Sequence, residues 1–413
     1  MDFFQYIPLS KAQEIVNGHL QDSVIGSEKV HLAESLDRIT AEDVVAMEDV
    51  PPFHRSTVDG FAVCSDDTFG ASETSPALFT IVDEIVMGQP AAVTLTSGQA
   101  AAIPTGGMLP PGADAVVMFE HTETLDANTL LVKDKIAPGE NIVSRGEDVG
   151  AGAVIVAKGQ KITPQHIGIL AACGCTQLAV RERLKVAVIS TGDELVDIGQ
   201  PVPLGKIRDV NYYVLSAMLR EAGCQVKQMG IVEDCYEKFL EALMEAVKTC
   251  HMVVISGGSS VGARDYTVKA IDALGKPGVL VHGISVKPGR PTIFAMVKAT
   301  PIFGLPGHPV AAMTICEQMV KPAVRCLMGQ GGMDGLSIPA TMLRNVASAP
   351  GRDDFVNVRL SKRAEHYVAE PILGKSGLIS IAAQADGMVR IPSNESGLYE
   401  GDVVEVFSIK KTR

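Results

Sequence analysis

The sequence predicts a multidomain α/β protein, with a three-layer, parallel-type sheet domain in its middle and β-rich regions elsewhere. Between residues 185 and 327, apolar strand-like runs alternate with amphipathic helical segments, which is typical of a parallel sheet covered on both faces. After residue 331, runs that alternate at period two lie between turns and predict a β barrel or sandwich. Residues 46–145 are rich in Val, Thr, Gly and Pro, which indicates a small β domain.

The central domain can be followed element by element. Strands are expected at "KVAVIS" (185–190), an apolar β-branched run, and then at "QVKQMGIV" (225–232) and "HMVVIS" (251–256). The segments between them place apolar residues at helical spacing. Helices are therefore expected in "NYYVLSAMLREAG" (211–223), from Asp234 to about 250, and in "DYTVKAIDALG" (265–275).

The N-terminal region contains one clear helical segment, "LSKAQEIVNGHL" (9–20). After residue 146 the chain returns to a helical segment that is expected to pair with the first one. We find no internal repeat and no low-complexity linker in the sequence.

The loops that follow the strands are the expected ligand site, because ligands of such sheets bind outside the carboxyl ends of the strands. These loops share glycines, acids or bases. They are "TGDEL" (191–195), the segment around Glu233 and Asp234, "GGSSVGARD" (257–265), "KPGRP" (287–291) and "GLPGHP" (304–309).

Three carboxylates follow strands of this sheet, those of Glu194, Asp234 and Asp265. Like charges gathered at one edge of a sheet are unfavourable unless a cation joins them. Mg²⁺ is a hard ion that takes carboxylate oxygens, water and phosphates, so the sequence predicts a magnesium site here. For Asp265 alone, a helix cap is the simpler interpretation. The histidines, His308 included, lack the spacing of a transition-metal site.

Anion-binding groups are expected at the same edge. The glycine bend after residue 256 exposes N–H groups beside a helix N-terminus, although it lacks the motifs of phosphate loops and of dinucleotide folds. Lys287 and Arg290 add two cations on a tight turn, where solvated surface charge is the alternative interpretation. The residues expected to bind the ligand are Thr191, Gly192, Gly257, Gly258, Ser260, Gly262, Lys287 and Arg290.

A further cluster lies outside the sheet domain, in "PPFHRSTVDGFAV" (51–63). Arg55 and Ser56 offer donors to an anion, and Asp59 precedes a glycine that allows a turn. Taken alone, this segment is more simply interpreted as a loop.

Composition limits the classes of partner. The net charge of −12 argues against nucleic acid or an acidic membrane, since no Lys/Arg block offsets it. No apolar run is long enough to span a bilayer, and the N-terminus lacks the features of a secretory signal, so we expect a cytoplasmic protein. The eight cysteines show neither disulfide nor zinc spacing and are expected to be reduced thiols.

Seven motifs occur in the order seen in one known family: "PPFHRSTVDGFAV", "IPTGGMLPPGADAVV", "RGEDV", "VAVISTGDEL", "ISGGSSVGARDYT", "VKPGRP" and "GLPGHPVAA". Nearly from end to end, the chain resembles the molybdopterin molybdenumtransferases, the MoeA family, to which the gephyrin E domain is also similar. The region after residue 331 contributes least to the resemblance.

The resemblance implies an enzyme of molybdenum cofactor synthesis, which inserts molybdate into adenylylated molybdopterin with Mg²⁺-dependent release of AMP. It implies functional roles for Asp59, Thr105, Asp148, Glu194, Asp234, Asp265 and Lys287, with Pro306 and Pro309 shaping the pterin pocket. Mg²⁺ would be held by Asp234, Asp265 and Glu194. Molybdate would be oriented by Arg55, Ser56 or Thr105.

The resemblance also implies a homodimer that works in one pathway with a molybdopterin adenylyltransferase. The implied domains are an elongated dimerisation domain (1–45 and 146–180), an inserted β domain (46–145), an α/β molybdopterin-binding domain (181–330) and a C-terminal β-barrel domain (331–413). The sequence departs from the family pattern at Ser259, Gly283, Arg290 and His308, all near the expected pterin and anion donors.

Two alternative functions remain open at this point. An adenylyltransferase acting on molybdopterin and ATP would leave the segment 51–63 and the C-terminal domain without a role. A binding or scaffold protein without turnover would have no need for the set of carboxylates. The sequence does not decide between molybdate and tungstate as the oxyanion.

Overall fold

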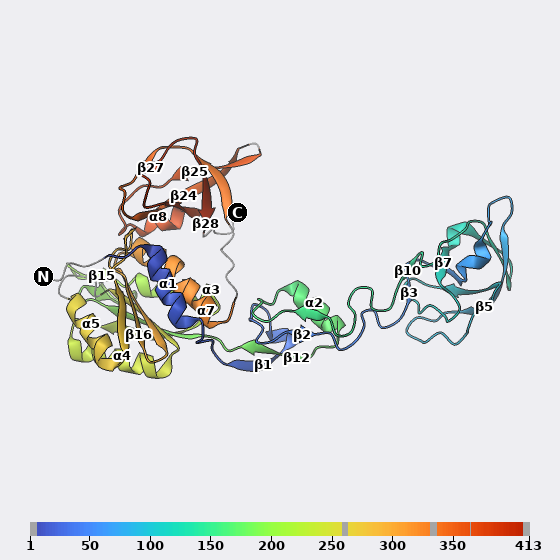
Figure 1. Ribbon diagram of the computed structural model, residues 1–413, viewed down its shortest axis with the longest axis horizontal. Helices are drawn as coiled ribbons and strands as arrows, with labels where there is room; N and C mark the ends of the chain where they lie inside the picture. The colour runs from blue at the N-terminus through green and yellow to red at the C-terminus, as the bar shows by residue number, and fades with distance from the viewer. Residues whose placement is uncertain (1–5, 258–262, 331–336, 364, 408–413) are drawn as a thin grey trace. The chain divides into compact units, whose positions relative to one another are not determined.

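The structure is a computed structural model that describes residues 6–257, 263–330, 337–363 and 365–407, with only the backbone described for 263–265. Contacts between Cα atoms divide the chain into two compact units. The first unit contains residues 1–28 and 181–413, and the second contains residues 29–180 (Figure 1). The four-domain division expected from the resemblance remains a prediction.

The first unit is built on a six-stranded sheet in the order β16-β13-β17-β21-β20-β18. The strands are β13 (Lys185–Thr191), β16 (Gln225–Val232), β17 (Met252–Gly257), β18 (Pro277–His282), β20 (Ile293–Val297) and β21 (Thr300–Leu305). β16, β13, β17 and β21 are mutually parallel, as predicted. β20 is antiparallel to both of its neighbours, which the alternation of strands and helices did not predict. Only two residues separate β20 from β21, too few for a parallel crossover.

Helices cover both faces of this sheet and give three layers (Figure 1). Apolar side chains of α4 and α5, including Phe239, Leu243 and Ile271, pack with Ala187 and Ile189 of β13 in one core. On the opposite face α3 packs against β13 and α6, and α1 packs against α7. The helices are α1 (Leu9–Leu20), α3 (Asn211–Glu221), α4 (Tyr236–Thr249), α5 (Ala263–Leu274), α6 (Pro309–Ile315) and α7 (Lys321–Leu327), with a π-helical turn, η4, at Cys316–Val320.

Two helix starts differ from the prediction. α4 begins at Tyr236 with Cys235 as its N-cap, so Asp234 lies in the loop before the helix rather than at its start. α5 begins at Ala263, two residues before Asp265, because the helix continues into the segment that was expected to be a bend.

The C-terminal part of the first unit is a barrel, one of the two predicted forms. β24, β25, β22, β28 and β26 pair in that order, and a β24–β26 pairing closes the ring. In β28, Val404 and Val406 are buried, whereas Val403 and Glu405 are exposed. This alternation is the one on which the prediction was based. The elements are β22 (Ile338–Met342), β24 (Asp353–Arg363), β25 (His366–Pro371), β26 (Gly387–Ile391), β28 (Val403–Phe407), the pair β23 (Val346–Ala347) and β27 (Gly397–Leu398), and α8 (Ile379–Gln384).

One short strand links the two halves of this unit. β19 (Val286–Lys287) pairs in parallel with the start of β24, so the turn that carries Lys287 is joined to the barrel. A second link is a hydrogen bond from the Val310 N–H of α6 to the Ser376 carbonyl, 3.1 Å long.

The second unit contains a six-stranded sheet within the region expected to be a small β domain. Its order is β7-β4-β6-β5-β9-β8, formed by β4 (Gly60–Val63), β5 (Ala77–Glu84), β6 (Gln99–Ile103), β7 (Ala115–Met118), β8 (Thr122–Asp126) and β9 (Thr129–Val132). Chain segments before and after this sheet pair with each other. These pairs are β1 (Ser27–His31) with β12 (Gln177–Arg181), β2 (Val44–Val45) with β11 (Val154–Val156), and β3 (Arg55–Ser56) with β10 (Ile142–Val143).

The two N-terminal helical segments belong to different compact units. α2 (Pro164–Ala172) packs on β11 and on a 3₁₀ turn, η1 (Leu32–Glu34), in the second unit, whereas α1 packs on α7 in the first. Two further short elements of the first unit, β14 (Leu195–Val196) and β15 (Ile207–Arg208), pair in parallel beside the strand ends. The remaining 3₁₀ turns are η2 (Ser65–Thr68) and η3 (Phe119–His121).

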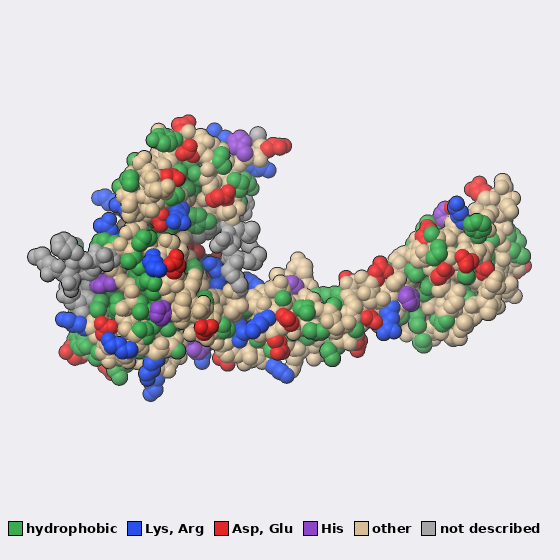
Figure 2. Space-filling model, viewed as in Figure 1, with side chains coloured by type: hydrophobic (Ala, Val, Ile, Leu, Met, Phe, Trp, Pro, Cys, Tyr) green, Lys and Arg blue, Asp and Glu red, His purple; other side chains and the backbone are tan. Residues whose placement is uncertain are grey.

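In the described ranges, none of the helices combines the length and apolar character needed to traverse a bilayer. Figure 2 shows Lys and Arg side chains intermixed with Asp and Glu on the face that it draws.

Candidate functional site

The carboxyl ends of β13 and β16 bring two of the predicted residues together. Thr191 ends β13, and its hydroxyl donates to Asp234 Oδ1 at 2.7 Å. The Tyr266 hydroxyl of α5 donates to the same oxygen at 2.8 Å, and the Asp234 N–H donates to Asp193 Oδ1 at 3.1 Å. We call these four residues the strand-end cluster. Tyr266 and Asp193 were not predicted, although both lie within the motifs that follow the strands.

Burial and the hydrogen bond to Asp234 raise the pKa of Tyr266 to about 12. The phenol therefore keeps its proton at neutral pH and remains a donor to the carboxylate. Within the described residues, the Thr191 and Tyr266 hydroxyls both donate to Oδ1 of Asp234 and so orient the carboxylate.

The expected magnesium ligands are only partly described. Asp265 belongs to α5, but its side chain lies outside the described part of the structure. Among the residues whose side chains are described, no three His, Cys, Asp or Glu form a metal-binding group. Glu194, Asp193 and Asp234 all lie in loops at these strand ends, and their carboxylate oxygens are the donors that Mg²⁺ prefers. The donor chemistry therefore fits a magnesium ion, and the triad remains a prediction.

A cavity of about 700 Å³, the strand-end cavity, opens at the carboxyl ends of β13, β17 and β21. This is where parallel α/β sheets bind their ligands, and the volume suits a bicyclic molecule with its substituents. The predicted residues that line it are Thr191, Glu194, Gly257 and Pro309. Gly258, Ser260 and Gly262, also expected there, lie outside the described residues, as does the departure at Ser259.

Glycine is required where two of these strand ends approach each other. Gly257 has φ +100°, and a Cβ atom there would lie 2.1 Å from the Thr191 carbonyl oxygen. Gly192 has φ +150°, and its Cβ would lie 2.7 Å from Glu194 Oε2. Gly257 thus allows β17 to approach β13 at the cavity, whereas at Gly192 the positive φ and the Glu194 side chain favour glycine.

Asn211, at the first position of α3, was not predicted but organises the cavity wall. Its side-chain amide donates to Ser256 Oγ and to the Gly307 carbonyl, each at 2.8 Å. Its buried Oδ1 has no hydrogen-bond partner within the described residues. Asn211 thus joins the end of β17 to the loop after β21 and leaves one acceptor on a residue that lines the cavity.

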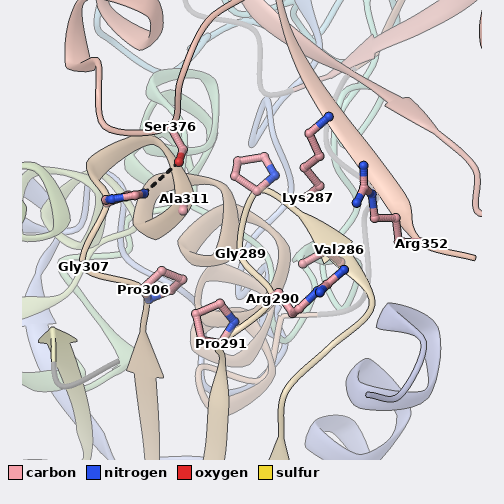
Figure 3. A pocket seen from close by; sticks show the side chains of 12 residues that line it. Val286, Lys287, Gly289, Arg290, Pro291, Pro306, Gly307, Ala311, Arg352 and Ser376 are labelled. Carbon is pink, nitrogen blue, oxygen red and sulfur yellow. Dashed lines mark hydrogen bonds between the residues drawn. The ribbon is translucent and has the colours of Figure 1, made fainter. Parts of the chain in front are cut away.

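A second cavity, of about 530 Å³, is lined by three cationic side chains, those of Lys287, Arg290 and Arg352. Figure 3 shows Lys287, which ends β19, Arg290 from the turn that follows it, and Arg352 from the chain that leads into β24. We call it the cationic cavity. Pro306, expected to shape the pocket, lines it too. Gly307 and His308 line both cavities, which therefore adjoin.

The barrel half of the first unit contributes residues that sequence reasoning missed. Arg352 and Ser376 line the cationic cavity, and Ser376 Oγ lies 2.9 Å from Nδ1 of His308 (dashed line in Figure 3). No local motif identifies them, because the β19–β24 pairing that brings them here joins residues far apart in the sequence.

A buried carboxylate orients two of the three cations. Asp354, whose side chain is 5% exposed, lies 3.3 Å from Lys287 Nζ through Oδ2 and 2.8 Å from Arg352 Nε through Oδ1. Charge-assisted bonds of this kind restrict the two cations, while three positive groups still exceed the one carboxylate. The cavity is therefore suited to an anion.

Asp59 and Thr105 come together in the second unit. The Thr105 N–H donates to Asp59 Oδ1 at 2.7 Å. Ser56 is buried, and its hydroxyl donates to the Val58 carbonyl at 2.6 Å, so it is committed within its own loop. Arg55 is exposed at the start of β3.

Asp148 lies apart from that pair, in the loop between β10 and β11, where its N–H donates to the Val50 carbonyl at 3.1 Å. Within the described residues, no hydrogen bond or ion pair joins its side chain to Asp59 or Thr105. The structure thus places Asp59 beside Thr105, and the functional roles of all three residues remain predictions.

Three family models match successive parts of this chain. Residues 7–174 match "MoeA N-terminal region (domain I and II)", residues 187–326 match "Probable molybdopterin binding domain", and residues 339–409 match "MoeA C-terminal region (domain IV)".

Similar proteins cover nearly the whole chain. A molybdopterin molybdenumtransferase of Staphylococcus epidermidis is 33% identical over 97% of this chain and 95% of its own. One from Staphylococcus aureus is 34% identical with the same coverage. Among solved structures, a molybdopterin biosynthesis MoeA protein from Pyrococcus horikoshii is 38% identical, covers 98% of this chain and 99% of its own, and superimposes with a TM-score of 0.84.

Proposed function

The chain belongs to the MoeA family of molybdopterin molybdenumtransferases, enzymes of molybdenum cofactor biosynthesis, and from this we propose its reaction. We propose that it transfers molybdenum from molybdate to the dithiolene of adenylylated molybdopterin. In this reaction the pyrophosphate bond of the adenylylated pterin is cleaved with uptake of water, and AMP leaves. The observation that carries the proposal is the pair of adjoining cavities, one at the strand ends and one lined by Lys287, Arg290 and Arg352.

The strand-end cavity would hold the pterin. Its volume of about 700 Å³ and its position at the ends of β13, β17 and β21 suit a pterin with its phosphate arm. Asn211 keeps the end of β17 and the loop after β21 together, and its free acceptor Oδ1 offers a partner for an amino or ring N–H of the pterin.

The cationic cavity would hold the oxyanion beside the pterin. Lys287 and Arg352, oriented by Asp354, together with Arg290 would donate hydrogen bonds to tetrahedral oxygens, with Ser376 as a neutral donor. Donors arranged in advance for negative charge are worth a few kcal/mol each in a transition state.

Glu194, Asp234 and Asp265 would hold Mg²⁺, which supplies charge neutralisation at the pyrophosphate when it is bound. Thr191 and Tyr266 restrict Asp234 through its Oδ1, and Oδ2 would be the oxygen offered to the ion. Asp59 and Asp148 would exchange protons with water or substrate, and the N–H of Thr105 fixes the orientation of Asp59.

The proposal also includes the location, the oligomeric state and the pathway partner of the enzyme. We propose a cytoplasmic homodimer that receives its adenylylated substrate from a molybdopterin adenylyltransferase, as the family resemblance implies. Light scattering after gel filtration would give twice the chain mass of 43.6 kDa, and a mass of one chain would contradict the dimer.

The decisive experiment supplies adenylylated molybdopterin with Mg²⁺ and either molybdate or tungstate, and measures AMP. We expect AMP to form only when the metal and an oxyanion are both present. ATP consumption with free molybdopterin would instead identify an adenylyltransferase, and tight pterin binding without any product would identify a scaffold protein. Either result would contradict the proposed reaction.

A further inference from the structure

The turn that carries Lys287 and Arg290 is supported by the N-terminal segment of the chain. Ile7 forms a parallel bridge with Ile284, and the Ser285 N–H donates to the Ile7 carbonyl at 2.8 Å. The residue next to this bridge, Tyr6, therefore lies beside the turn although 284 positions separate it from Arg290.

The Tyr6 ring faces the Arg290 guanidinium. The Arg290 Cζ atom lies 5.0 Å from the ring centroid, within the range of a cation–π interaction. Glycine at position 283 makes room for the ring. Gly283 has φ +94°, and a Cβ atom there would lie 2.7 Å from Tyr6 Cδ1 and 2.8 Å from Cε1.

Arg290 differs from the other two cations of the cavity in how it is held. Its backbone is fixed, because its carbonyl accepts from the N–H groups of Ile284 and Thr292, each at 3.0 Å. Lys287 and Arg352 share the Asp354 carboxylate, whereas Arg290 has no carboxylate within ion-pair distance among the described residues. An aromatic ring orients a guanidinium without neutralising its charge.

We propose that Tyr6 is a positioning residue for Arg290, and that it strengthens the binding of the oxyanion by holding an uncompensated cation in the cationic cavity. The inference rests on the proposed function, because it assumes that this cavity binds molybdate. It assigns a role in the site to the N-terminal segment and to Gly283.

Calorimetric titration with molybdate tests the inference on the full chain. We expect Tyr6→Leu to weaken molybdate binding by about threefold to tenfold, the range of one cation–π contact. Tyr6→Phe keeps the ring and should bind like the unchanged protein. Gly283→Ala should reproduce the loss, since its Cβ would displace the ring. Tyr399→Leu, at an exposed tyrosine of the barrel, is the matched control and should have no effect.

A double-mutant cycle separates positioning from general damage. Because Tyr6 acts through Arg290, we expect Tyr6→Leu to add little to the loss caused by Arg290→Ala. In steady-state assays, the KM for molybdate should rise while the KM for adenylylated molybdopterin stays unchanged. Additive losses in the cycle, or a Tyr6→Phe variant as weak as Tyr6→Leu, would overturn the inference.

The same measurements distinguish failure of the inference about Tyr6 from failure of the proposed function. If Arg290→Ala weakens molybdate binding and Tyr6→Leu does not, only the role of Tyr6 is wrong. If Arg290→Ala has no effect, or the unchanged protein does not bind molybdate, the assignment of the cavity is wrong and the inference falls with it.

Discussion

Asp234 illustrates how neutral side chains can prepare a carboxylate for a ligand. Its Oδ1 accepts hydrogen bonds from two hydroxyls, those of Thr191 and Tyr266. Hydroxyl donors restrict the carboxylate and leave its charge in place, whereas a lysine or an arginine would neutralise it. The negative charge thus remains available to a cation at the edge of the sheet.

The Tyr266→Phe substitution tests this arrangement. Phenylalanine keeps the ring but removes the donor, so Asp234 should lose orientation. We expect kcat for AMP release to fall by about tenfold, since a hydrogen bond to a charged group contributes roughly 1.5 to 3 kcal/mol. The Mg²⁺ concentration needed for half-maximal rate should rise as well. Unchanged values of both would show that the tyrosine plays no part in holding Asp234, and Tyr399→Phe is the control.

His251 should make folding stability depend on pH. Burial and the nearby Lys185 charge lower its pKa from 6.5, and its Nδ1 accepts the Lys185 N–H at 3.1 Å. The unfolded chain therefore binds a proton more readily than the folded chain, so stability is lost as pH falls below about 6.5. In urea unfolding, His251→Asn should reduce that loss, whereas His366→Asn, at an exposed site, should leave it unchanged. An identical loss in all three proteins would argue against His251.

At the scale of elements, the local sequence pattern predicted the strands and helices that depend on local contacts. The runs at 185–190, 225–232 and 251–256 became β13, β16 and β17. β13 and β17 are buried on both faces and are continuously apolar, whereas β16 is an edge strand and is more polar. The antiparallel β20 was missed, because no strand was predicted in the segment 293–297 and its two-residue hairpin to β21 was not recognised. The start of α4 was placed at Asp234 because the apolar stripe of the helix follows it closely, but Cys235 is the N-cap and Asp234 bonds to Thr191 instead.

Because β13 and β17 approach each other closely at Gly257, a side chain at this position should disturb the site. A methyl group there would lie 2.1 Å from the Thr191 carbonyl oxygen and would force the two strand ends apart. We expect Gly257→Ala to weaken binding of the pterin nucleotide by about fivefold to a hundredfold, because a core backbone shift typically costs about 1 to 3 kcal/mol. The control is Gly401→Ala, since Gly401 also has positive φ but has open space around it. Equal effects of the two substitutions in equilibrium binding would contradict the role of close approach.

At the scale of the molecule, the sequence could not reveal which distant segments meet. The apolar face of α1 was clear, yet its partner α7 lies some 300 residues further along the chain, and Gln13 Nε2 reaches the Gln318 carbonyl at 2.9 Å. Arg352 and Ser376 were missed for the same reason. Acids and bases at the strand ends were found because topology alone places them at one edge. The residues that the barrel contributes can be predicted only when the β19–β24 pairing is known.

The whole-molecule charge poses a final question, since a protein of net charge −12 is proposed to bind a dianion. Distant charges act through the solvent and are screened beyond about 8 to 10 Å at physiological salt. The cations of the cavity lie within contact distance of a bound oxyanion, so their attraction should exceed the general repulsion. We therefore expect the KM for molybdate to rise, by roughly threefold between about 0.05 and 0.5 M salt, as the local attraction is weakened.

Removing one local cation should flatten this salt dependence. Arg352→Ala leaves the net charge almost unchanged but takes one of three positive groups from the cavity. Its KM should be higher at low salt and should change less as salt is added. If the KM of the unchanged protein fell with salt instead, relief of general repulsion would be the larger effect. The oxyanion would then have to bind away from Lys287, Arg290 and Arg352.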